Sequence, residues 1–215
     1  MILEKERELI VEYGQKLITH GLTKGTGGNI SIFNKAEGLM AISPSGLDYF
    51  KTTPKDVVVL DLHGNKIDGD RNPSSEYSMH RIFYQKRDEV GAVLHAHSIY
   101  CSILAALHWK IEPVHYLIGY AGKDVRCAPY KLFGSEELSQ VAFEYMQDRY
   151  AVLLANHGLL AIGETIEYAF DTAEEIEFVA QIYYKAKCVG DPILLSSDEM
   201  DEFLRKFKPY GKKQV

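Results

Sequence analysis

The segment YAVLLANHGLLAIG, residues 150–163, places two short apolar runs on either side of a tight turn at His157-Gly158, and this pattern constrains the fold most. Each run is too short for an ordinary helix, and the residues between the runs end regular structure. The segment therefore predicts two adjacent antiparallel strands. Similar apolar runs bounded by turn residues occur at ISIF, GLMAIS, DVVVLDL and GAVLHAH. Together they predict a sheet with several strands and short connections.

Helical patterns lie before, between and after these strands. Apolar residues at helical spacing predict a helix over 3–19, which Gly21 ends. Ser74 or Ser75 is expected to cap a helix with an apolar inner face. Further helices are expected over 99–108, from Ser135 onward, over 165–189 and over 198–207. The segments VHYLIG and DVRCAPY are expected to form short strands or extended loops.

This order of elements predicts an α/β fold, a three-layer αβα domain with a largely antiparallel central sheet and helices on both faces. The chain contains no repeat, low-complexity segment or linker, so we expect residues 1–215 to form a single domain. The basic tail 208–215 is expected to be mobile. A dinucleotide-binding fold is not favoured, because GTGGN departs from GxGxxG and precedes a strand.

The charge balance narrows the choice of partners. The net charge of −6 argues against nucleic acid or an anionic membrane surface as the main partner. A small phosphate is still compatible, since backbone N–H groups and hydroxyls can bind it. The three cysteines are widely spaced, the start of the chain is charged, and no apolar run is long enough to span a bilayer. These features predict a soluble, cytoplasmic protein.

Two histidines interrupt an apolar strand in VLHAHS. Strand side chains alternate, so His95 and His97 are expected on one face with Cβ atoms roughly 6.5–7 Å apart. Two imidazoles at that spacing can bind one metal ion, although such a pair can equally be a hydrogen-bonded feature of a core or surface. His157 lies in a turn at a sheet rim, and Glu76 lies at a helix start. Three imidazoles and a carboxylate are a plausible tetrahedral zinc set.

Spacing alone does not show that these distant residues meet. The remaining histidines lack a comparable context and are assigned structural or surface roles: His20, His63, His80, His108 and His115.

Three segments are candidates for binding a phosphate. GTGGN exposes backbone N–H groups, SPSG adds serine hydroxyls, and PSSE combines hydroxyls with the N–H groups of a helix start. Each segment can also be only a turn or a cap. The chain lacks the GK[ST] of a nucleotide-binding P-loop.

The motifs GTGGNIS, SPSG, PSSE, HAHS and NHG occur in a fixed order along the chain. In this order they resemble the class II aldolase family of phosphosugar enzymes, and the similarity covers essentially the whole chain. The resemblance implies the class II aldolase/adducin-like fold and a zinc ion (Zn²⁺) held by Glu76, His95, His97 and His157. It implies phosphate binding by Gly28, Asn29, Ser45, Gly46, Ser74 and Ser75.

The same resemblance assigns the aldehyde end of the site. Tyr116 is implied as a proton donor from a neighbouring subunit, with Phe133 and Tyr210 lining the pocket. A homotetramer with sites between subunits follows from the resemblance. Among family members the similarity is greatest to enzymes of fucose breakdown, which cleave L-fuculose 1-phosphate to dihydroxyacetone phosphate and L-lactaldehyde. Glu76 is then expected to exchange a proton with C3.

Several alternatives remain. A 4-epimerase of L-ribulose 5-phosphate uses related chemistry, but its motif has aspartate at the position of Glu76. A methylthioribulose 1-phosphate dehydratase or another phosphoketose lyase ranks next. The longer rhamnulose 1-phosphate aldolases fit the chain length less well. A non-catalytic interaction domain would not need the four metal-binding candidates, and a purely structural zinc site is commonly rich in cysteine.

Overall fold

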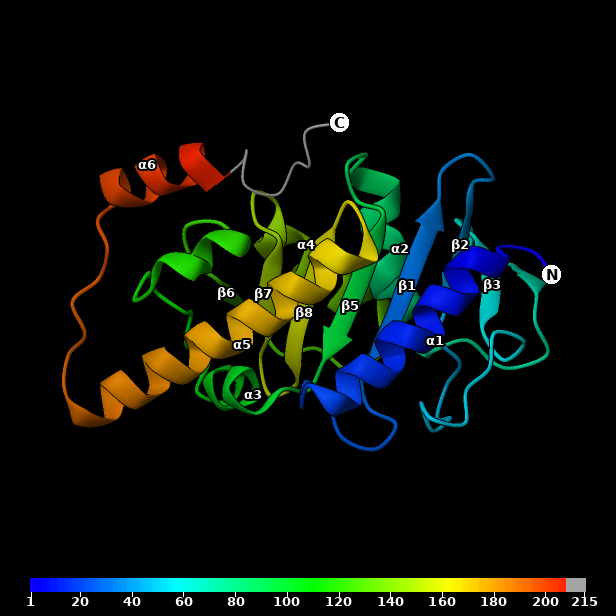
Figure 1. Ribbon diagram of the computed structural model, residues 1–215, viewed down its shortest axis with the longest axis horizontal. Coiled ribbons are helices and arrows are strands. Elements are labelled where there is room, and N and C mark those ends of the chain that lie inside the picture. Colours follow the sequence, from blue (N-terminus) through cyan, green and yellow to red (C-terminus); the bar gives the residue numbers. More distant parts are fainter. Residues whose placement is uncertain (208–215) are drawn as a thin grey trace.

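The computed structural model describes residues 1–207 and contains an eight-stranded sheet between layers of helices (Figure 1). The strand order is β4-β3-β2-β1-β5-β8-β7-β6. Neighbouring strands are antiparallel except for the parallel pair β6 and β7. The predicted α/β fold with a largely antiparallel sheet is confirmed. The strands are β1 (Asn29–Asn34), β2 (Leu39–Ile42), β3 (Val58–Asp61), β4 (Lys66–Asp68), β5 (Ala92–Ala96), β6 (Arg126–Ala128), β7 (Ala151–Leu154) and β8 (Gly158–Gly163).

Helices cover both faces of the sheet. The helices are α1 (Glu4–Thr19), α2 (Tyr77–Lys86), α3 (Ile99–Ala106), α4 (Glu136–Met146), α5 (Ile166–Val189) and α6 (Ser197–Phe207), with a short 3-10 helix η1 (Tyr116–Tyr120). Helices α1, α3 and α5 contribute to one buried core, and α2 and α4 contribute to the other. In Figure 1, α1 and α5 cross in front of the strands.

The alternation of strand side chains decides which helix layer each residue meets. On β5, Leu94 belongs to the core under α1 and α5, whereas its neighbour Val93 belongs to the core under α2 and α4. His95 therefore shares the α2 face with Val93. On β1, Ile30 lies in the α1 core, so Asn29 and Ser31 also face α2.

The strand register brings one end of β5 to the beginnings of two neighbours. Asn29 at the start of β1 pairs with His95, and Leu159 near the start of β8 pairs with Ala96. Because both pairings are antiparallel, residues that follow β5 lie next to residues that precede β1 and β8. The HAH, GTGGN and NHG segments consequently meet at one end of the sheet.

Two local expectations were wrong. The N-terminal cap of α2 is Glu76, not Ser74 or Ser75, and the Ser74 hydroxyl instead accepts a hydrogen bond from the Glu76 N–H at 3.3 Å. The segment VHYLIG is neither a short strand nor an extended loop, since its residues from Tyr116 onward lie in η1, where Gly119 packs against the ring of Phe203 on α6 so closely that no Cβ would fit.

Other boundaries agree closely with the sequence. Ser135 caps α4 by accepting a hydrogen bond from the Leu138 N–H, and Gly190 ends α5. The DVRCAPY segment contains β6. Among the residues described, no helix combines the length and apolar character needed to cross a bilayer. The predicted mobile tail 208–215 lies outside the described residues.

Candidate metal centre

Three imidazoles converge at the end of β5. The Nε2 atom of His95 lies 2.9 Å from Nε2 of His97 and 3.2 Å from Nε2 of His157. Tetrahedral zinc, with Zn–N distances of about 2.0–2.1 Å, separates its ligand nitrogens by roughly 3.3 Å. The three rings thus have the spacing of ligands to one cation, and they are the three histidines that the family resemblance implied as ligands.

The surroundings of His95 select the ring form that can bind a cation. Its Nδ1 lies 2.9 Å from the backbone carbonyl of Leu159, which can only accept a hydrogen bond. Nδ1 therefore carries the proton, and the neutral ring directs the lone pair of Nε2 into the cluster. Burial lowers the pKa of His95 well below its ordinary value, and the neighbouring His157 and His97 lower it further.

The other two rings behave in the same way. Burial, and next the proximity of His157, lower the pKa of His97. Burial also lowers the pKa of His157, against an opposing contribution from the Glu76 carboxylate. All three imidazoles are consequently held toward the neutral form that binds metal ions.

Glu76 completes the cluster from the start of α2. Its Oε2 atom lies 3.5 Å from Nε2 of His95, and its Oε1 atom lies 3.6 Å from Nε2 of His157. The residue is 6% exposed, and Oε1 is buried with no hydrogen-bond partner among the described residues. A buried carboxylate oxygen without a partner is costly. A divalent cation among the imidazoles would satisfy it, so these four residues fit a metal ion of the zinc type.

The candidate phosphate segments lie beside this cluster. Ser45 N donates to the carbonyl of Asn72 at 3.0 Å, and Ser74 N donates to the carbonyl of Ser43 at 3.1 Å. The SPSG and PSSE turns are thereby joined, and the hydroxyl-bearing Ser45 and Ser75, with Gly46, remain exposed. The structure therefore brings together the segments that the sequence proposed for phosphate binding.

The GTGGN turn is held by a residue that the sequence reasoning missed. Tyr49 donates from its hydroxyl to the carbonyls of Gly28 at 2.9 Å and Gly27 at 3.2 Å. Burial raises the pKa of Tyr49, which keeps the hydroxyl protonated as a donor. Tyr49 follows SPSG closely in the chain, and this proximity to a candidate motif was its only signal.

Gly28 couples this turn to the metal cluster. Its φ is +71°, and an added Cβ would lie 2.6 Å from the backbone oxygen of His95. An L side chain at this position meets both an unfavourable backbone conformation and a clash with a strand that carries a candidate metal ligand.

We expect Gly28→Ala to destabilise the protein more than Gly25→Ala does. Gly25 has a similar φ of +63° but open space around its Cβ position, so its substitution adds only the left-handed strain of roughly 1–2 kcal/mol. The clash at Gly28 should add roughly 1–3 kcal/mol. Denaturant unfolding of the two variants measures the difference, and equal losses of stability would contradict the coupling.

The residues predicted for the aldehyde end divide into three cases. Phe133 is exposed on the loop before α4, and the adjacent Gly134 lies so close to Ser75 that an added Cβ would be 2.9 Å from the Ser75 carbonyl oxygen. The structure thus places Phe133 beside the PSSE turn. Tyr210 lies outside the described residues.

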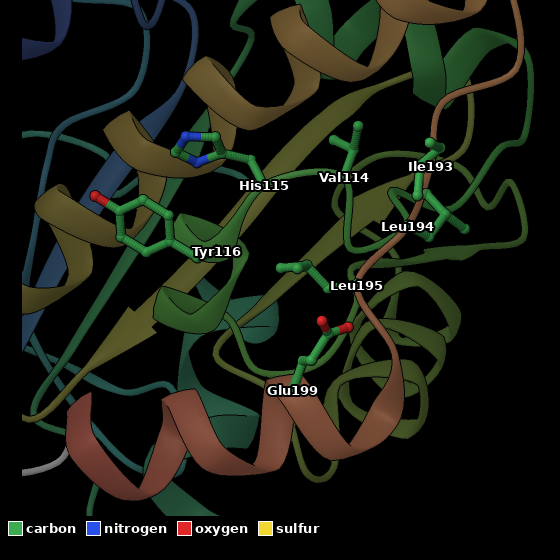
Figure 2. Close-up of a pocket in the computed structure, with 7 residues that line it drawn as sticks. All are labelled: Val114, His115, Tyr116, Ile193, Leu194, Leu195 and Glu199. Atoms are coloured by element: carbon green, nitrogen blue, oxygen red, sulfur yellow. The ribbon is translucent and has the colours of Figure 1, made fainter.

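Tyr116 is separate from the imidazole cluster. Its ring contacts Phe203 and His115, and the residue is 51% exposed. Tyr116 lines a surface cavity of about 390 Å³. Figure 2 shows its ring extending away from Leu195 and Glu199, which line the same cavity. Within residues 1–207, no hydrogen bond or ring contact of Tyr116 reaches the three histidines.

The fold and the cluster define an α/β protein with a site suited to a catalytic divalent cation. A profile of the Class II Aldolase and Adducin N-terminal domain family matches residues 8–184. The chain therefore belongs to this family, whose class II aldolases are metal-dependent.

Relatives with assigned activities cover almost the whole chain. A 5-deoxy-D-ribulose 1-phosphate aldolase of Bacillus thuringiensis serovar kurstaki is 58% identical over 98% of this chain and 99% of its own. An L-fuculose phosphate aldolase of Escherichia coli K12 is 38% identical over 89% of this chain and 88% of its own. A solved L-fuculose 1-phosphate aldolase superposes with a TM-score of 0.93 at 46% identity, covering 95% of this chain and 96% of that one.

Proposed function

We propose that this protein is a metal-dependent aldolase that reversibly cleaves the C3–C4 bond of a deoxyketose 1-phosphate. The products are dihydroxyacetone phosphate and a short aldehyde with a methyl end. The observation that carries the proposal is the cluster of Glu76 and three imidazoles, in which Glu76 and His95 are buried, beside the exposed Ser45 and Ser75. It offers a candidate cation site next to serine hydroxyls that can donate to a phosphate, since Ser75 directly precedes Glu76 and the SPSG and PSSE turns are joined. A non-catalytic domain would have no use for this arrangement.

The residues have distinct roles in the proposed reaction. A divalent cation bound by the cluster, which we propose to be zinc, would supply Lewis-acid stabilisation of the negative charge that develops during cleavage. Glu76 would give a proton to C3 in cleavage and remove it in synthesis. Gly28, Asn29, Ser45, Gly46, Ser74 and Ser75 would bind the phosphate.

Tyr116 would act on the C4 oxygen from a neighbouring subunit. In synthesis its hydroxyl would donate a proton to the C4 oxygen and become a phenolate, and in cleavage that phenolate would take the C4 hydroxyl proton back. Its exposure supports a role across an interface. The proposal therefore includes a homotetramer of single-domain chains with Phe133 and Tyr210 lining the aldehyde end. A monomeric mass in solution would contradict this part. A cytoplasmic location is also proposed, in keeping with three free cysteines.

Two substrates are favoured by different observations. Cleavage of 5-deoxyribulose 1-phosphate leaves acetaldehyde, and the 58% identity to a 5-deoxy-D-ribulose 1-phosphate aldolase favours it. L-fuculose 1-phosphate is one hydroxymethylene longer and leaves L-lactaldehyde, and the solved structure at 46% identity favours it. The exposed apolar residues Leu132 and Phe133 beside the PSSE turn suit the methyl end of either sugar.

We expect kcat/KM for 5-deoxyribulose 1-phosphate to exceed that for L-fuculose 1-phosphate by roughly 10- to 100-fold. An apolar pocket rejects an added hydroxyl only by about 100-fold, so the longer sugar should still react. Dihydroxyacetone phosphate released from each sugar can be measured by coupled reduction. L-ribulose 5-phosphate serves as the rival substrate. Its conversion to D-xylulose 5-phosphate, with no dihydroxyacetone phosphate from the other two sugars, would overturn the aldolase assignment in favour of an epimerase.

A further inference from the structure

A buried polar chain connects the Glu76 carboxylate to the interior of α2. Asn29 donates from Nδ2 to Oε2 of Glu76 at 2.9 Å, and the Oδ1 atom of Asn29 is hydrogen-bonded to Nε2 of His80. Nδ1 of His80 lies 2.7 Å from the Ser31 hydroxyl, which lies 2.6 Å from the Tyr84 hydroxyl. His80 and Ser31 are both 0% exposed. Folding does not require these polar contacts, because apolar side chains could fill the same space.

This buried polar chain forms because the side chains on one face of α2 and on one face of β1 recur at nearly the same distance. Glu76, His80 and Tyr84 are spaced four residues apart along α2, which corresponds to about 6 Å of helix rise. Asn29 and Ser31 are two residues apart on β1, which corresponds to about 6.6 Å of strand rise. The side chains of the two elements therefore interdigitate and bond in turn.

The hydrogen bonds of this buried polar chain run in one consistent donor-to-acceptor direction. An ionised Glu76 carboxylate only accepts, so Asn29 must present Nδ2 to it and turn Oδ1 toward His80. Oδ1 also only accepts, so Nε2 of His80 carries the ring proton and Nδ1 accepts from the Ser31 hydroxyl. Burial lowers the pKa of His80 to about 3, which keeps the ring neutral and this proton arrangement intact.

The consequence for Glu76 is that its two oxygens become different. Oε2 is held by Asn29, whereas Oε1 has no hydrogen-bond partner within residues 1–207 and lies toward His157. If His80 did not require an acceptor, the Asn29 amide could rotate and present its oxygen to the carboxylate. Two acceptors would then face each other, and Glu76 would leave its position.

We propose that His80 is a positioning residue that, through Asn29, holds Glu76 with Oε1 free to face the metal and the reacting carbon. The effect of His80 on catalysis rests on the proposed aldolase function. Its effect on the position of Glu76 does not depend on that function. The positioning role also gives Asn29 a function toward the carboxylate in addition to the phosphate role proposed above.

Two conservative variants separate positioning from packing. In His80→Gln, the terminal amide reaches the place of Nε2 and can still donate to Asn29, whereas in His80→Asn it reaches only the place of Nδ1. Loss of a residue that orients a metal ligand typically costs roughly 10- to 100-fold. We expect His80→Asn to lower kcat by that factor with little change in KM, and His80→Gln to restore most of it. Ser78→Ala, which removes the buried Ser78–Ser139 hydrogen bond elsewhere on α2, should leave kcat unchanged.

Two readouts do not depend on activity. Competition with a zinc chelator should show weaker zinc binding by roughly 10-fold or more in His80→Asn and near-normal binding in His80→Gln. Nitrogen-15 NMR of the zinc-loaded wild-type protein should show His80 neutral with its proton on Nε2. The second readout needs no variant, so it stays decisive even if a variant fails to fold.

The outcomes distinguish this inference from the proposed function. Equal losses in His80→Asn and His80→Gln, unchanged zinc binding in both, or a proton on Nδ1 of His80 would each overturn the positioning role. If no phosphoketose is cleaved at all, the aldolase proposal fails, whereas zinc affinity and the His80 ring form still decide whether the positioning chain exists.

Discussion

Replacing Glu76 by glutamine should lower turnover by roughly 100- to 10,000-fold, the range typical for the loss of a general acid–base, while the protein still binds a divalent cation. Glutamine has the shape of glutamate, and its amide oxygen can accept the same hydrogen bond from Asn29 that Oε2 accepts at 2.9 Å. The fold and the three imidazoles should therefore be preserved. The amide cannot carry a proton to and from C3, so the chemical step should fail.

Proton exchange provides a direct check on this role. Incubation of dihydroxyacetone phosphate with wild-type protein in deuterated water should replace one hydrogen on C3, as proton NMR can follow. Glu76→Gln should exchange far more slowly at an unchanged metal content. Glu144→Gln, an exposed carboxylate on α4, should behave as wild type. Exchange by Glu76→Gln at the wild-type rate would show that another group moves this proton.

The sheet could be predicted because its signals are local. Short apolar runs bounded by turn residues predicted strands such as β7 and β8, and capping by Ser135 predicted the start of α4. The errors arose where distant residues decide the local structure. Within η1, at residues 116–120, Gly119 packs against Phe203, and no local pattern contains this contact between residues more than eighty positions apart in the chain.

In the candidate site, too, local sequence patterns predicted one part of the arrangement and not the other. The period of a strand was sufficient to place His95 and His97 on one face, and the structure has their Nε2 atoms 2.9 Å apart. The proximity of Glu76 and His157 to these two histidines depends on strand pairings such as Ala96 with Leu159. No local sequence pattern contains such pairings. The family resemblance supplied that information. The roles of these residues remain predictions.

Neither the local sequence patterns nor the family resemblance assigned His80 to the site. The sequence assigned it a structural role, although it follows Glu76 by four residues and therefore shares one helix face with it. That spacing was visible, but a partner on β1 was not. Only the packing of α2 on Asn29 and Ser31 makes this histidine part of the site.

Replacing His95 by alanine should abolish measurable turnover and weaken zinc binding by more than about 100-fold, because even the loss of groups that only orient metal ligands costs about 10- to 100-fold. His95 is completely buried, and its Nδ1 is fixed by the Leu159 carbonyl, so its Nε2 is the most constrained of the three nitrogens. Metal analysis of the purified variant and chelator competition measure the loss. Added zinc at high concentration should not restore wild-type activity.

The same substitution also removes a buried ring and leaves the Leu159 carbonyl without its partner, so lost stability must be separated from lost metal binding. His97→Ala makes this separation, since His97 is more exposed and its removal disturbs the core less. Both variants should lose metal, but only His95→Ala should also unfold at clearly lower temperature once wild type and variants are stripped of metal. His63→Ala, an exposed histidine outside the cluster, should keep metal and activity. If His95→Ala and His97→Ala retained stoichiometric zinc, the ion would have to bind elsewhere in the chain, and the convergence of imidazoles at the end of β5 would be no more than a hydrogen-bonded feature of the fold.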